Sequence, residues 1–377
     1  MRRDRPAAPD PHARIRRDDV DPFVRGALLL GCGGGGDVRI GALLAEQVVG
    51  QRGVELLTCA QASSRGLVVL PVGVVGASSG VLDERLPHGN EMHLARDAIE
   101  QLTGRPVGAV LPIEVGGANG PIGLWAAAGL GLPLVDADLC GRAVPRLDQM
   151  TSGFSGRELT PAVLIDGDGR RIDLGTSGRG FGGAELEASV RALVAAGCGW
   201  SVLAFRPLEA AEIAGAVVPG AVSRALQLGA AVPASGPDRG AEAVTSLTAL
   251  GADVLVQGRV VGLRRPGFEV GPADDTGWVS VETEAGLARL DLQSELLAVS
   301  LDGLVLATTP DVLALLDAGS GQVLDLDSVR VGARVAALRV EALLPEESEE
   351  YLRRVGPAAY GLELAAGGAS KTSGSGE

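Results

Sequence analysis

A change of periodicity near the middle of the chain constrains the fold most. From about residue 24 to residue 172, apolar runs of strand length alternate with segments in which apolar residues recur every three or four positions. This alternation is typical of a mostly parallel sheet covered by helices. After helical patterns at 184–196 and 221–228, the sequence changes to short strand-like runs separated by turn residues. These runs are 254–261, 278–283, 296–300, 305–308, 322–326 and 335–340. The sequence therefore predicts an α/β layer domain with a mostly parallel sheet, followed by a domain that contains a β-barrel-like segment.

The length of the chain also favours two domains, because one hydrophobic core rarely organises 377 residues. We expect the α/β domain, with its glycine-rich loops, over 19–172 and the C-terminal domain over 173–365. Helices are expected over 184–230 of the second domain, and its β-rich part over 252–345. The polar ends at 1–18 and 366–377 are predicted to be a disordered arm and a disordered tail.

The charge balance excludes two classes of partner. The chain has 33 Lys and Arg against 47 Asp and Glu, a net charge of -14. Nucleic acids and anionic membranes both need clustered cations, so we expect neither as a partner. The longest apolar runs, 66–77 and 122–135, are shorter than the roughly 20 residues of a spanning helix. With no signal-peptide pattern at the start, we expect a soluble, cytoplasmic protein.

Rare residue types exclude further chemistries. Lys371 is the only lysine and lies in the predicted tail, which argues against pyridoxal phosphate and against a phosphate-loop lysine. The histidines are His12, His88 and His93, too few and too scattered for a three-histidine metal site. The cysteines are widely spaced and form no Cys-x-x-Cys pair, so we expect reduced thiols and no zinc knuckle. With so few lysines, histidines and cysteines, acid–base chemistry must therefore depend mainly on carboxylates or on a single histidine.

A glycine-rich loop at 31–36 matches the pattern Gly-x-Gly-x-x-Gly. We predict a strand at Val24–Leu30 before it and a helix from Asp37 after it. In that context the backbone N–H groups of the loop and the helix N-terminus would bind an anion or a developing oxyanion. The alternatives are a contact with a nucleotide phosphate and a merely tight turn. The loop residues that we propose for substrate binding are Gly33, Gly34, Gly35 and Gly36, together with Cys32. The next predicted strand ends at Thr58, with no acid for a ribose, and so we expect no NAD.

Cys32 lies inside this loop, just before a predicted helix. A helix N-terminus lowers the pKa of a thiol, which makes Cys32 a candidate nucleophile or substrate contact. The alternative is that a small buried residue suits the loop. His88, in a loop before Gly89, is the histidine that we expect to reach a substrate, although loop histidines are more often merely exposed.

Acidic residues follow two predicted strands. Asp136 and Asp138 come after 132–135 and Glu114 follows 107–113. Because ligands of open α/β sheets bind at the carboxyl ends of the strands, these carboxylates are our candidate catalytic residues. Brought together, they would raise one pKa or bind a cation. The alternative is that the two aspartates cap a turn and Glu114 is solvated.

Two further polar residues belong to the same segments. Arg142 would stabilise a carboxylate or an oxyanion, or form a structural salt bridge. Asn119 would bind substrate, or cap the helix that we predict at Pro121. A cluster of Asp136, Asp138 and Glu114 would accept Zn²⁺ or Mn²⁺ without requiring either. The general base would then be a carboxylate, a metal-bound water or His88.

These motifs together resemble the S-methyl-thiohydantoin desulfurase family, formerly a domain of unknown function. The motifs are Leu30–Asp37, Ile113–Asn119 (Ile-Glu-Val-Gly-Gly-Ala-Asn), Leu132–Asp138 (Leu-Pro-Leu-Val-Asp-Ala-Asp) and Gly141–Pro145. Shorter similar pieces recur at Gly258–Val261, Gly267–Phe268, Thr309–Asp311 and Val355–Pro357, so that the resemblance extends from about Asp19 to Leu364. The chain departs from the family pattern at Cys32, where we expect a small or hydroxyl residue, and at Ser294–Glu295, where we expect Asn-Glu.

The resemblance implies a fold, an activity and partners. It implies an α/β layer domain followed by a domain with a β-barrel, encoded beside hydantoinase and oxoprolinase subunits. The implied activity is a hydrolase-type step of sulfur metabolism, in which a thiohydantoin-type ring loses thiol or sulfide at carbon 2 and becomes a hydantoin. The alternative is a non-catalytic, hydantoin-binding accessory subunit of a hydantoinase- or oxoprolinase-type enzyme. The expected partners are the small ligand, a hydantoinase-type enzyme and further copies of the chain in a homo-oligomer.

Overall fold

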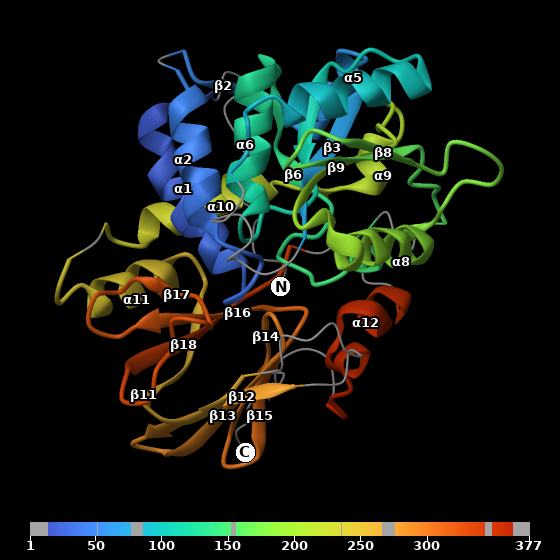
Figure 1. Ribbon diagram of the computed structural model, residues 1–377. Coiled ribbons are helices and arrows are strands. Elements are labelled where there is room, and N and C mark those ends of the chain that lie inside the picture. The colour runs from blue at the N-terminus through green and yellow to red at the C-terminus, as the bar shows by residue number, and fades with distance from the viewer. Residues whose placement is uncertain are drawn as a thin grey trace, which may run out of the picture. The chain divides into compact units, whose positions relative to one another are not determined.

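The computed structural model describes residues 14–50, 52–76, 86–151, 156–234, 236–265, 276–343 and 349–364. Contacts group the described residues into two compact units (Figure 1). Unit 1 holds the chain up to Gly31, then Gly35–Ala231, and Leu343. Unit 2 holds Cys32–Gly34, Val232–Ala342 and residues 349–364. None of the described helices has the length and apolar character to cross a membrane.

Unit 1 is built on an eight-stranded sheet of the order β1-β2-β5-β4-β3-β9-β7-β8. Its strands are β1 (Arg14–Ile15), β2 (Val54–Leu57), β3 (Val69–Val75), β4 (Ala109–Pro112), β5 (Leu134–Val135), β7 (Ala162–Asp166), β8 (Arg171–Leu174) and β9 (Ser201–Phe205). The pairs β2–β5, β5–β4 and β4–β3 are parallel, and the other pairs are antiparallel. The prediction of a mostly parallel sheet was therefore wrong, and the sheet is mixed. The antiparallel β9 inserts between β3 and the hairpin β7–β8, and nothing local in its apolar sequence reveals that pairing.

Helices cover both faces of this sheet. On one face α6 (Asn119–Leu130) packs on β3 and β4, and α5 (Glu91–Thr103) packs on β7 and β9. On the other face a buried cluster, which includes Leu164 and Leu203 of the sheet, joins the sheet to α3 (Cys59–Ser64), α8 (Gly183–Leu193) and α9 (Ile213–Ala216). A short π-helical segment, η2 (Val194–Cys198), extends α8, and a 3₁₀ turn, η1 (Leu147–Gln149), packs beside it. The predicted layer arrangement of strands and helices is thus present in unit 1.

The glycine-rich loop follows a helix. The segment predicted as a strand, Val24–Leu30, is the second half of α1 (Arg17–Leu30), so the strand prediction was wrong. A continuous apolar run fits a buried helix as well as a buried strand. This helix lies very close to α10 (Ala221–Ala231), as a Cβ added at Gly26 would come within 1.8 Å of the Ala225 carbonyl oxygen.

The start of the described chain is ordered. The residues Arg14–Asp18, expected to be disordered, form β1 and the start of α1.

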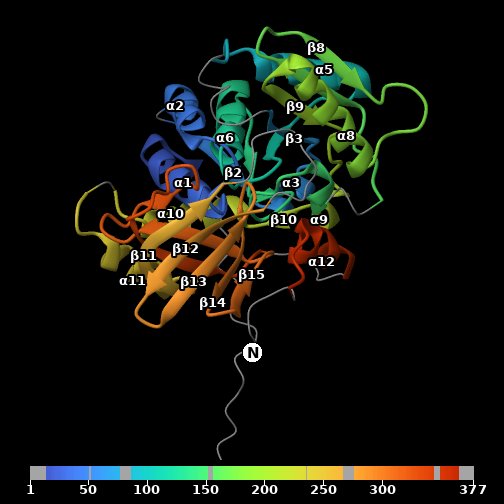
Figure 2. The ribbon, with the colours of Figure 1, turned by 60° about the horizontal axis from the view of Figure 1, so that its bottom comes forward.

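Unit 2 contains an antiparallel sheet of eight strands in the order β15-β14-β13-β12-β11-β18-β16-β17 (Figure 2). Its strands are β11 (Asp253–Arg264), β12 (Gly277–Thr283), β13 (Gly286–Leu292), β14 (Leu296–Leu301), β15 (Leu304–Thr308), β16 (Val312–Asp317), β17 (Val323–Leu324) and β18 (Arg334–Val340). Its helices are α11 (Gly240–Ala249), α12 (Glu349–Val355) and the 3₁₀ turn η3 (Pro357–Tyr360). The pairing of the described strands does not close into a ring, so the sheet is open and a barrel is not formed by them.

The division of the chain by contacts differs from the division expected from sequence. Contacts divide the chain between Ala231 and Val232, whereas the boundary predicted from the sequence lies at 172/173. The reason is that β9 and α10, both downstream of that boundary, join the sheet and helices of unit 1.

Candidate active site

The ends of the parallel strands in unit 1 carry a group of buried polar residues. Glu114 follows β4, Asp136 follows β5, and Asp138 ends the short strand β6 (Ala137–Asp138). Their exposed fractions are 7%, 2% and 0%, and Asn119 in the first turn of α6 is also buried. We call Glu114, Asn119, Asp136 and Asp138 the acid network. Its members were all predicted from sequence as site residues.

Asp138 links two loops. Its Oδ2 accepts a hydrogen bond from Val115 N at 2.7 Å, and its Oδ1 accepts from Gly141 N at 2.7 Å and Cys140 N at 3.1 Å. Burial raises the pKa of Asp138 to about 7; these three N–H donors oppose the rise, and the charge of Asp136 adds to it. At neutral pH, therefore, this carboxyl group is protonated for a substantial part of the time.

Asp136 holds the start of α10. Its Oδ1 accepts from Ser223 N at 2.8 Å and its Oδ2 from Ser223 Oγ at 2.8 Å. Burial raises the pKa of Asp136, and the hydrogen bonds from Ser223 and from Val222 N lower it. Ser223 was not predicted as a site residue, because it lies 87 residues from Asp136 and carries no local signal of this pairing. Nearby, the burial of Cys59 itself raises the pKa of its thiol to about 11, and the charge of Asp136 adds to the rise, so that this thiol stays protonated at neutral pH.

Glu114 and Asn119 are brought into direct contact. Asn119 Nδ2 donates to Glu114 Oε1 at 2.8 Å, and Glu114 Oε2 accepts from Val144 N at 3.0 Å. The side-chain oxygen of Asn119 accepts from Val74 N, in β3, at 2.7 Å. Asn119 therefore joins the ends of β3 and β4. Through its four members, the acid network fixes the carboxyl ends of three neighbouring strands and the start of α10.

Arg142 lies with the acid network and is enclosed. It is 1% exposed, and its Nε donates to the Ala143 carbonyl oxygen at 3.0 Å. Burial raises the pKa of the Cys140 thiol well above its ordinary value; the charges of Asp138 and Glu114 add to the rise and that of Arg142 opposes it. Cys140 is thus a buried thiol, and its Sγ donates weakly to the Ile113 carbonyl at 3.5 Å. Arg142 supplies positive charge close to the carboxylates.

The arrangement does not resemble a metal centre. Among the described residues, no group of three or more His, Cys, Asp and Glu side chains could hold a metal ion. Both carboxyl oxygens of Asp136, Asp138 and Glu114 accept hydrogen bonds from N–H or O–H donors. The network is thus organised by backbone and side-chain donors.

The first part of the glycine-rich loop belongs to unit 2. The Cys32 carbonyl accepts from Leu296 N at 2.8 Å, and the Gly33 carbonyl accepts from Leu326 N at 2.8 Å. At Gly34 an added Cβ would lie 2.1 Å from the Ser294 carbonyl oxygen, so only glycine fits there. Cys32 is fully buried. Close packing against Ser294–Leu296 and against Leu326 explains why the loop has small residues at these three positions.

The second part of the loop packs within unit 1. The Gly35 carbonyl accepts from Ala118 N at 2.8 Å, and a Cβ at Gly35 would lie 3.0 Å from the Gly117 Cα. Gly36 follows with a positive φ of 83°. The side chain of Asp37 accepts from Arg39 N and caps α2 (Val38–Val48). A carboxylate of the chain itself thus occupies the helix end that we had predicted to bind an anion.

His88 lies just before α5, at the surface. Its side chain is 68% exposed and faces the fully buried Glu91, with His88 Nδ1 3.8 Å from Glu91 Oε1. Glu91 was not singled out by sequence, because an acid in the first turn of a helix is a common capping pattern.

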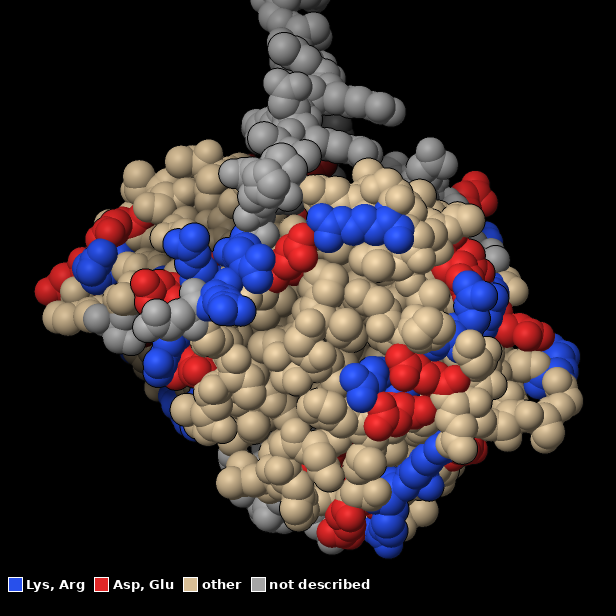
Figure 3. Space-filling view, turned by 90° about the horizontal axis from the view of Figure 1, so that it is seen from above, with Lys and Arg blue, Asp and Glu red and all other residues tan. Residues whose placement is uncertain are grey.

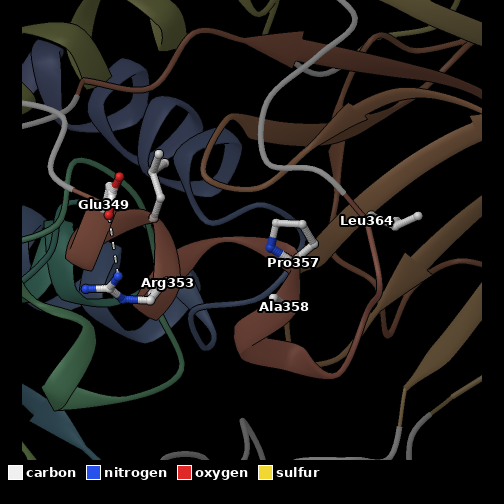
Figure 4. Close-up of a pocket in the computed structure, with 6 residues that line it drawn as sticks. Glu349, Arg353, Pro357, Ala358 and Leu364 are labelled. Atoms are coloured by element: carbon white, nitrogen blue, oxygen red, sulfur yellow. Dashed lines mark ion pairs between the residues drawn. The ribbon is translucent and has the colours of Figure 1, made fainter.

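A hollow of about 310 Å³ in unit 2 contains none of these residues (Figure 4). Its lining is Glu349, Leu352, Arg353, Pro357, Ala358 and Leu364. Glu349 and Arg353 point toward one another in Figure 4 and form an ion pair at 3.7 Å, but their side chains are 94% and 69% exposed. An exposed ion pair above an apolar lining offers no chemistry of its own.

Charged residues are mixed on the face of the molecule drawn in Figure 3. Blue and red side chains lie next to one another in small groups, separated by broad uncharged areas. Ion pairs of this kind include Arg65–Glu55 at 2.9 Å and Arg96–Asp97 at 2.6 Å, both partly exposed. This face therefore carries no continuous basic surface.

Comparison with known proteins identifies the family. The S-Me-THD-like N-terminal domain matches residues 18–175, and the S-Me-THD-like C-terminal domain matches residues 183–367. The chain belongs to the S-methyl-thiohydantoin desulfurase-like family. The resemblance noted from the motifs is thereby confirmed. Both family domains are present in the order that the resemblance implies.

A solved structure shares the fold of this family member. The X-ray crystal structure of a protein from Chromobacterium violaceum has a TM-score of 0.76 and 24% identity, covering 95% of this chain and 99% of that chain. At that identity the likeness concerns the fold alone. No curated protein matches the chain.

Proposed function

We propose that the chain hydrolyses an S-methyl-thiohydantoin-type ring at carbon 2. Membership of the family across both domains is the observation that carries this proposal, since it names the substrate class. In the reaction a water oxygen bonds to carbon 2 and the bond from carbon 2 to sulfur breaks. The thiol leaves with one proton, the other proton goes to the ring nitrogen, and the new carbonyl completes a hydantoin.

The acid network supports this reaction by positioning the strand ends. Asp136, Asp138 and Glu114 are enclosed and hydrogen-bonded, so we assign them the task of holding the loops at the carboxyl edge of β3, β4 and β5. A rigid edge reduces the entropy that is lost when ring and water are brought together. Arg142 balances the negative charge of the network, and Asn119 keeps Glu114 in place.

The test is turnover by the purified chain. An S-methyl-thiohydantoin is incubated with the protein, released thiol is measured with a chromogenic disulfide, and the hydantoin is measured by mass spectrometry. We expect equal amounts of both products, above the rate in buffer. The assay is repeated with chelator and with added Zn²⁺ or Mn²⁺. No thiol release under any of these conditions would overturn the proposal, and release that requires an added hydantoinase-type enzyme would support an accessory role.

A further inference from the structure

One edge of the unit 1 sheet is long and regular enough to pair with another strand. Among the described residues, β1 and β8 are the terminal strands of this sheet. β1 has two residues, whereas β8 (Arg171–Leu174) has four and pairs with β7 in one unbroken register. β8 contains no proline and no bulge, two features that commonly block an edge strand. Figure 2 shows β8 at the outer margin of unit 1, beside α5.

The alternation of the β7–β8 ladder shows which backbone groups of β8 are open. Asp166 N donates to the Arg170 carbonyl at 3.1 Å, so these two residues form a hydrogen-bonded pair. Hydrogen-bonded and non-hydrogen-bonded pairs alternate in an antiparallel ladder, and so the N–H and C=O groups of Ile172 face β7. The N–H and C=O groups of Arg171 and Asp173 then face away from β7. No described strand pairs with them, and they are available to a further strand.

The side chains along this edge carry opposite charges. Ile172 and Leu174 pack against the buried cluster of unit 1, which leaves Arg171 and Asp173 together on the opposite face of the sheet. These two residues form an ion pair, with Arg171 Nε 2.6 Å from Asp173 Oδ1, and their side chains are 33% and 32% exposed. Arg171 Nη1 also donates to Gln101 Oε1, in α5, at 2.6 Å. The edge thus presents one positive and one negative side chain, two positions apart.

These charges select one way for two copies of β8 to pair. An antiparallel pair joins the open backbone groups with Arg171 opposite Arg171, with Asp173 opposite Asp173, or with Arg171 opposite Asp173. The first two registers place like charges directly opposite one another, which destabilises a sheet. The third places opposite charges across the seam twice. Because the two strands are identical and antiparallel, this pairing is a closed two-fold dimer.

An exposed leucine borders the same edge. Leu94, in α5, is 36% exposed, and its Cδ1 lies 3.9 Å from the position of a Cβ at Gly169, in the β7–β8 turn. In the register that pairs opposite charges, Gly169 lies opposite Gly175 of the second copy. Leu94 therefore lies next to both ends of the seam, and pairing removes apolar surface from water as well as joining backbone groups.

We propose that β8 is a dimerisation edge, at which a second copy of this chain adds its own β8 in antiparallel orientation, with Arg171 of each copy opposite Asp173 of the other. Charged side chains discourage pairing with an unrelated strand, but this charge pattern complements its own inverse. Backbone hydrogen bonds supply the attraction, and the charges fix the register. Since the seam is short, the dimer exchanges reversibly with the monomer. The inference concerns assembly and does not depend on the proposed function.

The first test measures the mass of the full chain by sedimentation velocity, from about 1 to 200 μM, the range of weak interfaces. We expect a monomer–dimer equilibrium. Arg171→Asp and Asp173→Arg each turn two attractive pairs into two repulsive ones, and each should weaken the dimer by about tenfold or more. Glu282→Arg is the matched control, because Glu282 pairs with Arg259 at 2.9 Å on β12, a strand with neighbours on both sides. It should leave the equilibrium unchanged.

Combining the two substitutions distinguishes this seam from any other. The double variant Arg171→Asp/Asp173→Arg again places opposite charges across the seam and should dimerise like the unsubstituted chain. An equimolar mixture of the single variants should form a heterodimer, because one copy then carries two acids and the other two arginines. Unchanged melting temperatures would show that each variant folds. A chain that stays monomeric over the whole range, single variants that dimerise normally, or a mixture that does not dimerise would each overturn the proposal.

Hydrogen exchange tests the strand pairing itself, and mass spectrometry with fragmentation follows it residue by residue. The amides of Arg171 and Asp173 should exchange rapidly in dilute protein and more slowly as the concentration rises, whereas β7 protects the amide of Ile172 at every concentration. Asp173→Arg should remove the concentration dependence at Arg171. If the chain dimerises while exchange at these two amides stays constant, the interface lies elsewhere and the use of β8 is refuted.

Discussion

Replacing Asp138 by Asn removes a titration that occurs only in the folded chain. In the unfolded chain the carboxyl has the ordinary pKa of 3.8, and in the folded chain burial raises its pKa to about 7. The folded state therefore binds a proton between these values that the unfolded state does not. Stability from this group is greatest below pH 3.8, declines as pH rises toward 7, and is absent above it.

The magnitude follows from the size of the shift. Each pH unit in the window is worth about 1.4 kcal/mol, so the two units from pH 5 to pH 7 correspond to roughly 3 kcal/mol. The unfolding free energy of the unsubstituted protein, minus that of Asp138→Asn, should thus fall by about 3 kcal/mol between pH 5 and pH 8. The asparagine side chain in this variant also has an NH2 group where one carboxylate oxygen accepted a hydrogen bond. This mismatch lowers the free energy of unfolding by about 1–3 kcal/mol at every pH.

The assay is urea unfolding at several pH values between 5 and 8, followed by tryptophan fluorescence. Trp125 and Trp200 are both buried in unit 1 and report on the unit that contains Asp138. Thiol release by the same variant would show whether the loops that Asp138 holds matter for turnover.

A matched control comes from Asp166, at the end of β7. It is 1% exposed and accepts from Asp168 N at 3.0 Å and from Arg170 N at 2.9 Å. Burial acts to raise the pKa of Asp166, but hydrogen bonds and the charge of Arg170 outweigh it, and the net shift is downward. Asp166→Asn should therefore cost the same stability at pH 5 and at pH 8. If the curves for Asp138→Asn and the unsubstituted protein stay parallel over this range, the raised pKa is wrong.

Two further predictions concern a hydrogen bond and a helix–helix contact in unit 1. Melting temperatures measured by circular dichroism check both. Ser223→Ala removes the 2.8 Å hydrogen bond to Asp136 and should cost about 1.5–3 kcal/mol, whereas Ser189→Ala, on the exposed face of α8, should cost almost nothing. Gly26→Ala places a methyl group 1.8 Å from the Ala225 carbonyl oxygen and should separate α1 from α10, whereas Gly129→Ala in α6 meets no atom within 4 Å and should be neutral or stabilising. Equal stabilities within either pair would contradict the described contacts.

The candidate site could be predicted from sequence where its residues follow predicted strands. Glu114, Asp136 and Asp138 come directly after apolar runs that do form β4 and β5, so their common edge follows from the parallel order of those strands. The partners of these residues could not be predicted in the same way. Ser223 reaches Asp136 only because α10 packs beside the end of β5, a contact between segments 87 residues apart.

The fold was predictable to a similar extent. Alternating runs identified many of the strands, but β9, β13 and β16 were missed. In β9, an apolar run of five residues after a helix has no signal of its own. Val24–Leu30 was assigned to the wrong class for a related reason, since all-round burial removes the polar face that marks a helix. In both cases tertiary packing decides between conformations that the local sequence leaves equivalent.

The glycine-rich loop illustrates why spacing alone does not establish a binding site. Gly-x-Gly-x-x-Gly specifies backbone freedom and the absence of a side chain, and both properties serve packing as well as anion binding. Here Gly34 approaches the Ser294 carbonyl, while Gly35 approaches Gly117. The N-terminus of α2, where an anion would be bound, is capped by Asp37. In this chain a helix, α1, precedes the loop and a carboxylate, that of Asp37, caps the helix after it, and both observations favour packing over anion binding at this position.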